Sequence, residues 1–324
     1  MYVRGFGTIK RILSIVIIII FLLLLFVGFQ YFNVGSPRDL TQRLNREIIA
    51  HRGVHQDFRK QDLDDRTCTA ARIFKPTHPY IENTKASIQA AFQYGATMVE
   101  IDVRPTKDNY LVVFHDDMLD CRTNGKGYVK NHMLEELRKL DIGYGYTFDG
   151  GKTFPFRDKA IGEILTLKEV LSLFAGRKFL IHNKNGNNRT VSQRIAEVVL
   201  SLPVKQRANI FLWAQDASYA SIQRLVPTIK RLTLPRQKIK QIIQSYVYSF
   251  GLSPIGKGLS GEGVVLPLKY SKYIWGWPYT FLAKLYRNKV RFYVLADTVK
   301  DFESVEGLPI HGIITDHIEV LGSL

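Results

Sequence analysis

The chain has 324 residues, of which 46% are apolar, 12% aromatic and 23% charged. This is the composition of an ordinary globular protein, and it excludes a disordered or low-complexity chain. The 45 Lys and Arg outnumber the 29 Asp and Glu, so the net charge is +16, which favours an anionic partner such as nucleic acid, an acidic membrane surface or a phosphorylated substrate. Two cysteines, Cys68 and Cys121, are too few for a disulfide scaffold or a Cys-rich zinc module.

An uncharged apolar run from Ile12 to Phe32 comes first in the chain. It matches the roughly 20 residues that a membrane-spanning helix needs, whereas a cleaved signal peptide, the alternative, has an apolar core of about 7–15 residues. Arg4, Lys10 and Arg11 precede the run, so the positive-inside rule places the N-terminus in the cytoplasm. We therefore expect a single-pass membrane protein with a basic cytoplasmic tail over 1–11, a transmembrane anchor over 12–32, a linker over 33–46 and an extracytoplasmic domain over 47–324.

Short β-branched runs alternate with amphipathic stretches through the rest of the chain. This alternation indicates a parallel sheet, either a closed barrel or a doubly wound sheet. The predicted strands are Glu47–His51, Thr97–Val103, Tyr110–His115, Lys178–His182, Ile210–Ala214, Ile229–Leu234, Gly263–Leu266, Arg291–Ala296 and His311–Thr315. The predicted helices are Thr84–Tyr94, Leu167–Phe174, Val191–Leu202, Ala217–Val226, Gln237–Tyr248, Tyr279–Tyr286 and Lys300–Val305.

One connection is too short for a parallel crossover. Six residues separate Val103 from Tyr110, whereas a parallel crossover needs about a dozen residues or more, so the third strand must fold back as a hairpin. The remaining eight strands are the number that closes a (β/α)8 barrel. We predict an α/β fold, a TIM barrel with an extra hairpin strand after strand two, preceded by one transmembrane helix.

Chemically reactive side chains gather where the predicted strands end, which in such a barrel is the mouth that carries the chemistry. Glu100 and Asp102 alternate along one strand and share the face that points into the barrel. Two adjacent carboxylates repel each other, so a divalent cation between them is predicted. A lone histidine at a strand end is usually a surface or core residue. Here several reactive side chains occur together, and this combination favours a functional site. The candidates are His51, Arg52, Glu100, Asp102, His115, His182 and Lys184.

Several separate motifs follow one another along the chain: His51-Arg52-Gly53, Glu82-Asn83-Thr84, Gly95 to Val103, Thr106-Lys107-Asp108, His115-Asp116, Thr123 to Gly127, Leu165 to Val170 and Gly312 to Asp316. Their order and spacing resemble the glycerophosphodiester phosphodiesterase family over about residues 48–317. The resemblance implies a TIM barrel that cleaves a phosphodiester carrying a glycerol or similar polyol with the help of a metal.

The resemblance also implies roles for individual residues. His51 and His115 match the family's acid/base pair, and Arg52 and Lys184 match positions that hold the phosphate. Glu100 and Asp102 match metal ligands. Glu82 matches a polar residue near the mouth, although Glu82-Asn83-Thr84 also has the pattern of a helix start capped by Asn83.

The chain departs from the family at the third metal ligand. Where the family has Glu-x-Lys, this chain has His182-Asn183-Lys184. An imidazole keeps the ligand count but removes one negative charge, which shifts the expected ion from calcium or magnesium toward manganese or zinc. The alternative is a degraded metal site. The family's tryptophan near the seventh strand is also missing, and Phe292 to Leu295 stand there.

A second departure is a longer stretch, about His55 to Pro79, which we expect to lie over the mouth. It contains Cys68. Because Cys68 and Cys121 both belong to segments over the same mouth, and the predicted compartment is oxidising, we expect them to form a disulfide. Two separate buried thiols are the alternative.

Much of the positive charge is local. Residues Ala217 to Ala296 hold thirteen Lys or Arg and one acidic residue, Glu262, for a net charge of +12. Within this region Lys269 to Phe281 follows a strand end and mixes aromatics with lysines, a pattern typical of a membrane interface. We expect this segment at the mouth, meeting an anionic membrane surface. A buried aromatic cluster is the alternative, and export of the domain argues against nucleic acid.

Two functions follow. The first is metal-dependent hydrolysis of a glycerophosphodiester or lysophospholipid-like phosphodiester at the membrane surface, with one divalent ion (magnesium, calcium, manganese or zinc). The alternative is a catalytically weakened barrel that binds phospholipid headgroups or phosphorylated polymers.

Overall fold

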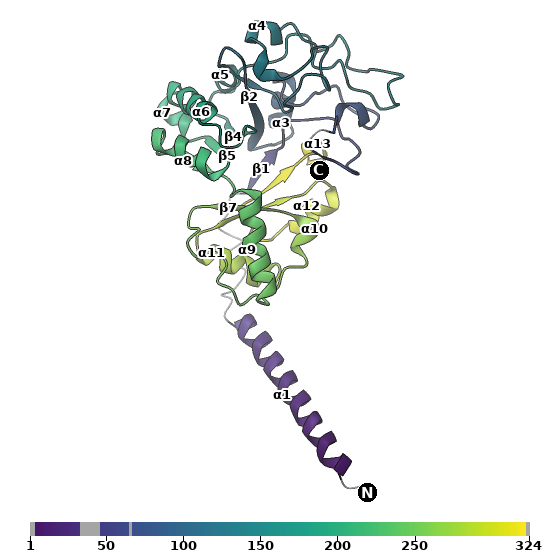
Figure 1. Ribbon diagram of the computed structural model, residues 1–324, viewed down its shortest axis with the longest axis vertical. Helices are drawn as coiled ribbons and strands as arrows, with labels where there is room; N and C mark the ends of the chain where they lie inside the picture. The colour runs from purple at the N-terminus through teal and green to yellow at the C-terminus, as the bar shows by residue number, and fades with distance from the viewer. Residues whose placement is uncertain (1–3, 33–45, 65–66, 322–324) are drawn as a thin grey trace.

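The computed structural model describes residues 4–32, 46–64 and 67–321. Its first helix, α1 (Arg4–Phe32), stands apart from the folded body (Figure 1). The segment Ile9–Phe26 has a mean hydropathy of 2.8 and is long and apolar enough to cross a membrane. Most of the predicted linker, residues 33–45, lies outside the described residues.

Eight parallel strands form the barrel, in the order β6-β5-β4-β2-β1-β9-β8-β7. The backbone N–H of Leu234, just after β6, donates to Gly263 O of β7 at 2.8 Å and joins the two ends of this order. A Cβ at Gly263 would lie 1.6 Å from Leu232 O, so glycine is required for this close approach. The strands are β1 (Glu47–Ala50), β2 (Met98–Pro105), β4 (Lys178–Asn183), β5 (Ile210–Trp213), β6 (Lys230–Arg231), β7 (Gly263–Pro267), β8 (Arg291–Leu295) and β9 (Gly312–Thr315).

The predicted hairpin is confirmed. Strand β3 (Leu111–Val113) pairs antiparallel with β2, with Val103 opposite Val113. The loop between the two strands turns at Asn109, whose φ of 63° is one that asparagine tolerates better than most residues. The (β/α)8 prediction with an added strand after strand two is therefore correct.

The helices start where the sequence offers caps. In α3 (Lys85–Gln93) and α5 (Leu167–Leu173) a threonine accepts from the backbone three residues on, and the side chain there reaches back to the threonine N–H. The other main helices are α6 (Arg189–Ser201), α8 (Asp216–Leu225), α9 (Arg236–Tyr248), α11 (Tyr279–Arg287) and α12 (Val299–Val305). Short helical turns missing from the sequence prediction are α4 (Leu134–Leu137), α7 (Val204–Arg207), α10 (Leu268–Ser271) and α13 (Ile318–Leu321).

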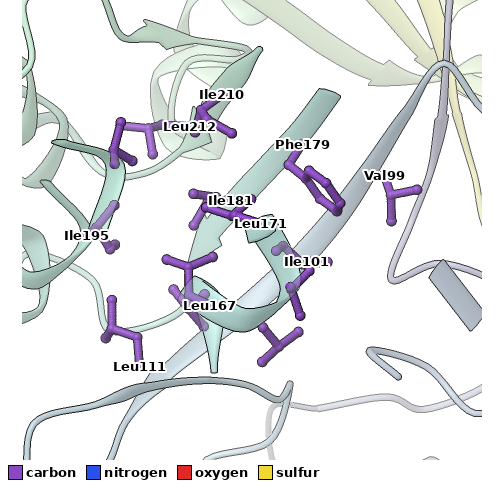
Figure 2. Packing of buried hydrophobic residues seen from close by; sticks show 14 of the residues in the cluster. Val99, Ile101, Leu111, Leu167, Leu171, Phe179, Ile181, Ile195, Ile210 and Leu212 are labelled. Carbon is purple, nitrogen blue, oxygen red and sulfur yellow. The ribbon is translucent and has the colours of Figure 1, made fainter. Parts of the chain in front are cut away.

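Alternation along each strand divides the core into two layers. Val99, Ile101 and Val103 of β2 point outward and pack with β4, β5, α5 and α6, as Figure 2 shows for Phe179, Ile181, Ile210, Leu212, Leu167, Leu171 and Ile195. The inner layer fills the barrel with one side chain from most strands: Ile49, Met98, Leu180, Leu232, Val265, Tyr293 and Ile314. Glu100 and Asp102 belong to the inner face and are fully buried. The middle of the barrel is thus a packed apolar core, with Glu100 and Asp102 toward its mouth.

The long stretch after β1 lies over the mouth, as expected. Lys60 Nζ lies 2.7 Å from Asp316, the residue that follows β9. Cys68 and Cys121 form a disulfide, which confirms the predicted pairing and ties this stretch to the loop after β3.

The basic aromatic segment takes a different course from the one expected. It leaves the mouth as α10, but Trp275 O accepts from Tyr246 Oη at 3.1 Å and the Trp275 ring packs 5.7 Å from that of Phe250. Tyr246 lies in the last turn of α9 and Phe250 two residues after this helix, and a barrel helix ends opposite the mouth. Trp277 and Phe281 pack inward against Phe292. The prediction that the whole segment lines the mouth is therefore wrong.

Candidate active site

Two histidines at the mouth have the same arrangement. His51 follows β1, and its Nδ1 lies 2.6 Å from Asp316 Oδ1; His115 follows β3, and its Nδ1 lies 2.7 Å from Asp116 Oδ1. A carboxylate at Nδ1 fixes a proton there and leaves Nε2 for the reaction. Those Nε2 atoms face the groups of β2 and β4: His51 Nε2 lies 3.9 Å from Glu100, and His115 Nε2 lies 3.0 Å from Lys184 Nζ.

The environment of His115 favours its neutral form. Burial, with the positive charge of Arg52 next in importance, lowers the pKa of His115 to about 4. Its position is fixed from the backbone as well, because Arg104 donates to His115 O from Nε at 2.9 Å and from Nη2 at 2.8 Å. A neutral, immobilised imidazole can accept a proton at the pH of most cells.

Arg52 is held by acids on two sides. Its φ of 61° is unusual for a residue with a side chain, and this turn directs the backbone N–H to Glu100 Oε2 at 3.1 Å. The guanidinium reaches Glu82 Oε1 at 3.1 Å and lies 3.4 Å from Asp102 Oδ2. Its Nε is buried without a hydrogen-bond partner among the described residues. This Nε is the atom that lies 3.4 Å from Asp102 Oδ2, so the guanidinium is held between two carboxylates.

Glu100, Asp102 and His182 form a cluster that suits a divalent cation. One ligand atom from each lies within 4.8 Å of the others, and His182 Nδ1 lies 3.1 Å from Glu100 Oε1 and 3.3 Å from Asp102 Oδ1. Asp102 Oδ1 is buried and has no hydrogen-bond partner within the described part of the chain. Two carboxylates and an imidazole are a common donor set for such ions, so the residues present fit the predicted metal.

Neighbouring side chains hold this cluster in place. The ring of His182 stacks on Trp213 of β5 with centroids 4.8 Å apart and planes 12° from parallel. Asn83 donates to Asp102 Oδ2 at 3.1 Å and accepts from the Asp102 N–H at 3.2 Å. Asn83 was predicted to cap a helix, but Thr84 is the cap of α3. The asparagine is thus free to orient a carboxylate of the site.

All seven predicted site residues are brought together: Glu100, Asp102 and His182 lie within β2 and β4, and His51, Arg52, His115 and Lys184 follow β1, β3 or β4 by one or two residues. The described residues also contain partners that were not assigned a role from the sequence: His55, Lys60, Asp116, Arg122, Tyr146, Trp213 and Asp316. His51, His55 and Asp316 offer ligand atoms within 4.8 Å of one another. The Lys60 ammonium already lies against Asp316, so we interpret this group as a support for His51.

A sequence model of the glycerophosphoryl diester phosphodiesterase family matches residues 51–242, more than half of the chain. The chain belongs to this family. The match includes all seven predicted residues of the mouth, and the structure extends the same fold to β9.

Curated relatives agree with this assignment. A glycerophosphodiester phosphodiesterase of Caldanaerobacter subterraneus is 43% identical over 102 residues, which are 31% of this chain and 38% of that protein. A glycerophosphodiester phosphodiesterase of Bacillus altitudinis is 30% identical over 173 residues, 53% of this chain and 67% of that protein. The chain thus matches between about a third and two thirds of the length of these family members.

Solved structures share the fold. A glycerophosphodiester phosphodiesterase from Agrobacterium tumefaciens superposes with a TM-score of 0.58 at 20% identity, covering 86% of this chain and 100% of that one. A phosphodiesterase from Oleispira antarctica, solved with its product sn-glycerol-3-phosphate, gives a TM-score of 0.60 at 19% identity and covers 88% of this chain and 98% of that one. These family structures support the barrel over nearly the whole described body.

Proposed function

We propose that the protein is a phosphoric diester hydrolase that acts on glycerophosphodiesters or lysophospholipid-like phosphodiesters, with His51 and His115 as its acid/base pair. The observation that carries the proposal is the matched pair of imidazoles, each with a carboxylate at Nδ1 and its Nε2 directed toward the cluster of β2 and β4. The product-bound relative from Oleispira antarctica supports the substrate class.

The residues divide the reaction between them. Arg52 and Lys184 would hold the phosphate and stabilise the negative charge that grows on its oxygens. His115, kept neutral, would take a proton from the attacking water, whose oxygen forms the new bond to phosphorus. His51 would give a proton to the alcohol oxygen as the old phosphorus–oxygen bond breaks. The products are a free alcohol and a phosphate monoester, so atoms and protons balance.

Glu100, Asp102 and His182 would hold the divalent ion. When bound, the ion polarises the phosphate and neutralises charge that the cationic side chains leave uncompensated. Burial lowers the pKa of His182, but hydrogen bonds to Asp102 and Glu100 outweigh this effect and raise it. The same two carboxylates that attract a proton to this ring would attract a metal instead.

Hydrolysis of a substrate panel tests the proposal. The panel runs from glycerophosphoethanolamine through lysophosphatidylcholine to phosphatidylglycerol, each with magnesium, calcium, manganese and zinc. His51→Ala and His115→Ala should each lower turnover by about 10²–10⁴-fold, the usual contribution of acid–base groups, while circular dichroism stays that of the wild type. Activity within a few-fold of the wild type in either variant would exclude the two-histidine mechanism. Binding of glycerol phosphate without turnover of any substrate would favour the alternative, a weakened barrel that binds phospholipid headgroups or phosphorylated polymers.

We also propose that α1 anchors the barrel to a membrane, with residues 1–11 cytoplasmic and the barrel outside. Arg4, Lys10 and Arg11 before the apolar run support this orientation, and the disulfide fits an oxidising compartment. The N-terminal mass of the membrane-bound protein tests it. A mature chain that lacks α1 would instead identify a cleaved signal sequence.

We propose an anionic lipid surface as the partner of the end of the barrel that lies opposite the mouth. Tyr248, Phe250, Leu252, Tyr273 and Trp275 are exposed large side chains near the end of α9, and we call them the aromatic surface. Lys257 and Lys272 are exposed nearby. Exposed aromatics with lysines are typical of a membrane interface. Because β1 begins at this same end of the barrel, the chain from α1 enters here, and we propose that this end contacts the bilayer while the mouth opens toward water.

A further inference from the structure

Arg122, in the loop after β3, is a buried arginine, and all three nitrogens of its guanidinium donate hydrogen bonds. It is 3% exposed, and its Nε donates to Asp116 Oδ2 at 2.8 Å. Nη1 donates to Glu82 Oε2 at 2.8 Å and to Tyr146 Oη at 2.6 Å, while Nη2 donates to Thr69 Oγ1 at 2.7 Å. An enclosed arginine with four partners is held in one geometry and transmits that geometry to them.

Each of its two acidic partners holds a residue of the site with the other carboxylate oxygen. Asp116 Oδ1 lies 2.7 Å from Nδ1 of His115, and Glu82 Oε1 accepts a hydrogen bond from Nη1 of Arg52. Arg122 thus lies behind both the imidazole proposed as the base and the guanidinium proposed to hold the phosphate. One cation fixes two functional side chains that come from different strands.

The disulfide joins the two backbones that surround this guanidinium. Cys121 precedes Arg122 and Cys68 precedes Thr69, so the bridge covalently fixes the arginine beside the acceptor of its Nη2. The two cysteines are 53 positions apart, and Cys68 belongs to the long stretch over the mouth. Without the bridge, this stretch would lose its covalent link to the loop after β3.

We propose that Arg122 is a positioning residue for His115 and Arg52, and that the Cys68–Cys121 bridge keeps Arg122 beside its hydrogen-bond partners. The proposal rests on the proposed phosphodiesterase function. It concerns how the catalytic groups are held, and Arg122 itself lies behind them, against Asp116 and Glu82.

The first variant to test is Arg122→Lys, in the full chain reconstituted in phosphatidylcholine nanodiscs. A lysine keeps the charge but cannot donate to Asp116, Glu82 and Thr69 together. We expect kcat on glycerophosphoethanolamine to fall about 10–100-fold, as when a hydrogen-bonded partner that orients a metal ligand is lost, with a smaller change in KM. Arg138→Lys, at an exposed ion pair with Glu169, is the matched control and should retain wild-type kinetics.

A readout on His115 separates positioning from a general loss of fold. The ring contacts Asp116 and Lys184, and the charges of Arg52 and Asp102 also act on its pKa. When Asp116 loses the hydrogen bond from Arg122 Nε, its carboxylate becomes a stronger partner for a protonated ring, so the pKa of His115 should rise. The acid limb of the kcat/KM profile should move to higher pH in Arg122→Lys and in Cys68→Ala/Cys121→Ala. Side-chain nitrogen NMR should show the same rise and a loss of the fixed Nδ1–H tautomer.

The NMR readout does not need turnover, so it remains decisive if the wild type hydrolyses none of the substrates and the proposed function fails. Kinetics within threefold of the wild type, with an unchanged His115 tautomer and pKa in Arg122→Lys, would overturn the positioning role. The same result in Cys68→Ala/Cys121→Ala alone would overturn the role of the bridge. A loss of kcat with an unchanged His115 signal would likewise refute positioning of this ring.

Discussion

Asp316 Oδ1 lies 2.6 Å from Nδ1 of His51, although the two residues are 265 positions apart. Burial raises the pKa of Asp316, but the hydrogen bonds and positive charges of His51 and His55 together outweigh this effect and hold the pKa well below the usual range. The carboxylate is therefore ionised. It is supported in turn by Lys60, so the first histidine of the mouth depends on the last strand of the barrel and on the long stretch after β1.

We expect Asp316→Asn to lower kcat at least about tenfold, because a neutral amide no longer favours the Nδ1–H tautomer of His51 or stabilises its protonated form. The loss should be smaller than that in His51→Ala. Steady-state kinetics on glycerophosphoethanolamine measures both. Glu303→Gln, on the exposed side of α12, should behave as the wild type. Equal kinetics in Asp316→Asn and wild type would mean that His51 is oriented by other contacts.

His182→Glu should change the metal preference. It places a third carboxylate beside Glu100 and Asp102, and oxygen ligands favour magnesium and calcium, whereas an imidazole suits zinc better. We expect chelator-treated wild type to regain most activity with manganese or zinc, and the variant to shift toward magnesium or calcium. Thermal unfolding with each metal alone provides a second measurement. His132→Glu, at an unrelated histidine, is the control, and an unchanged metal order in His182→Glu would exclude this residue as a ligand.

The sequence predicts the barrel and the seven residues at its mouth because both depend on local patterns. Strand spacing requires the hairpin after Val103, and each candidate side chain lies within a strand or follows one by one or two residues. In a parallel barrel such positions meet at one end, regardless of the conformation of the segments that connect the strands.

The supporting contacts could not be predicted in the same way. Arg122 carries no signal of its own, since three of its four partners are 24 to 53 positions away and become its neighbours only in the folded chain. The aromatic segment was misplaced for a related reason. Its sequence shows that it leaves a strand end, but the course it then takes depends on packing of Trp275 against Phe250 and Tyr246.

Glu82 should make stability depend on pH in the acid range. Burial raises the pKa of Glu82, but Arg122 and then Arg52 outweigh burial and lower it from 4.5 to about 2. A lowered folded-state pKa stabilises the protein above pH 4.5, and this contribution is lost as the pH falls from 4.5 toward 2. The shift corresponds to about 3 kcal/mol of unfolding free energy.

Urea unfolding between pH 6 and pH 2.5 measures this contribution. Glu82→Gln should be less stable than the wild type at pH 6, and the difference should narrow as the pH falls through the window. Glu303→Gln serves as the exposed control. A difference that stays constant from pH 6 to pH 2.5 would show that ionised Glu82 does not provide the stabilisation.

The proposed orientation at the membrane predicts which tryptophan meets lipid. Trp275 is 47% exposed on the aromatic surface, whereas Trp213 stacks on His182 at the mouth and Trp277 packs inward against Phe281 and Phe292. In nanodiscs of phosphatidylglycerol and phosphatidylcholine brominated near the headgroup, the fluorescence of the full chain should be quenched. Trp275→Phe should remove most of the quenching, and Trp213→Phe should retain it.

Salt and charge provide the second half of this test. Surface charges are screened over about 10 Å at 0.1 M salt, so quenching of Trp275 should weaken as salt rises, and it should weaken in Lys257→Gln/Lys272→Gln. Lys168→Gln, at an exposed lysine of α5, is the matched control. Quenching that survives in Trp275→Phe and disappears in Trp213→Phe would mean that the mouth faces the bilayer. In that case lipid-like phosphodiesters would reach His51 and His115 from the membrane, whereas the orientation proposed here favours substrates that arrive from water.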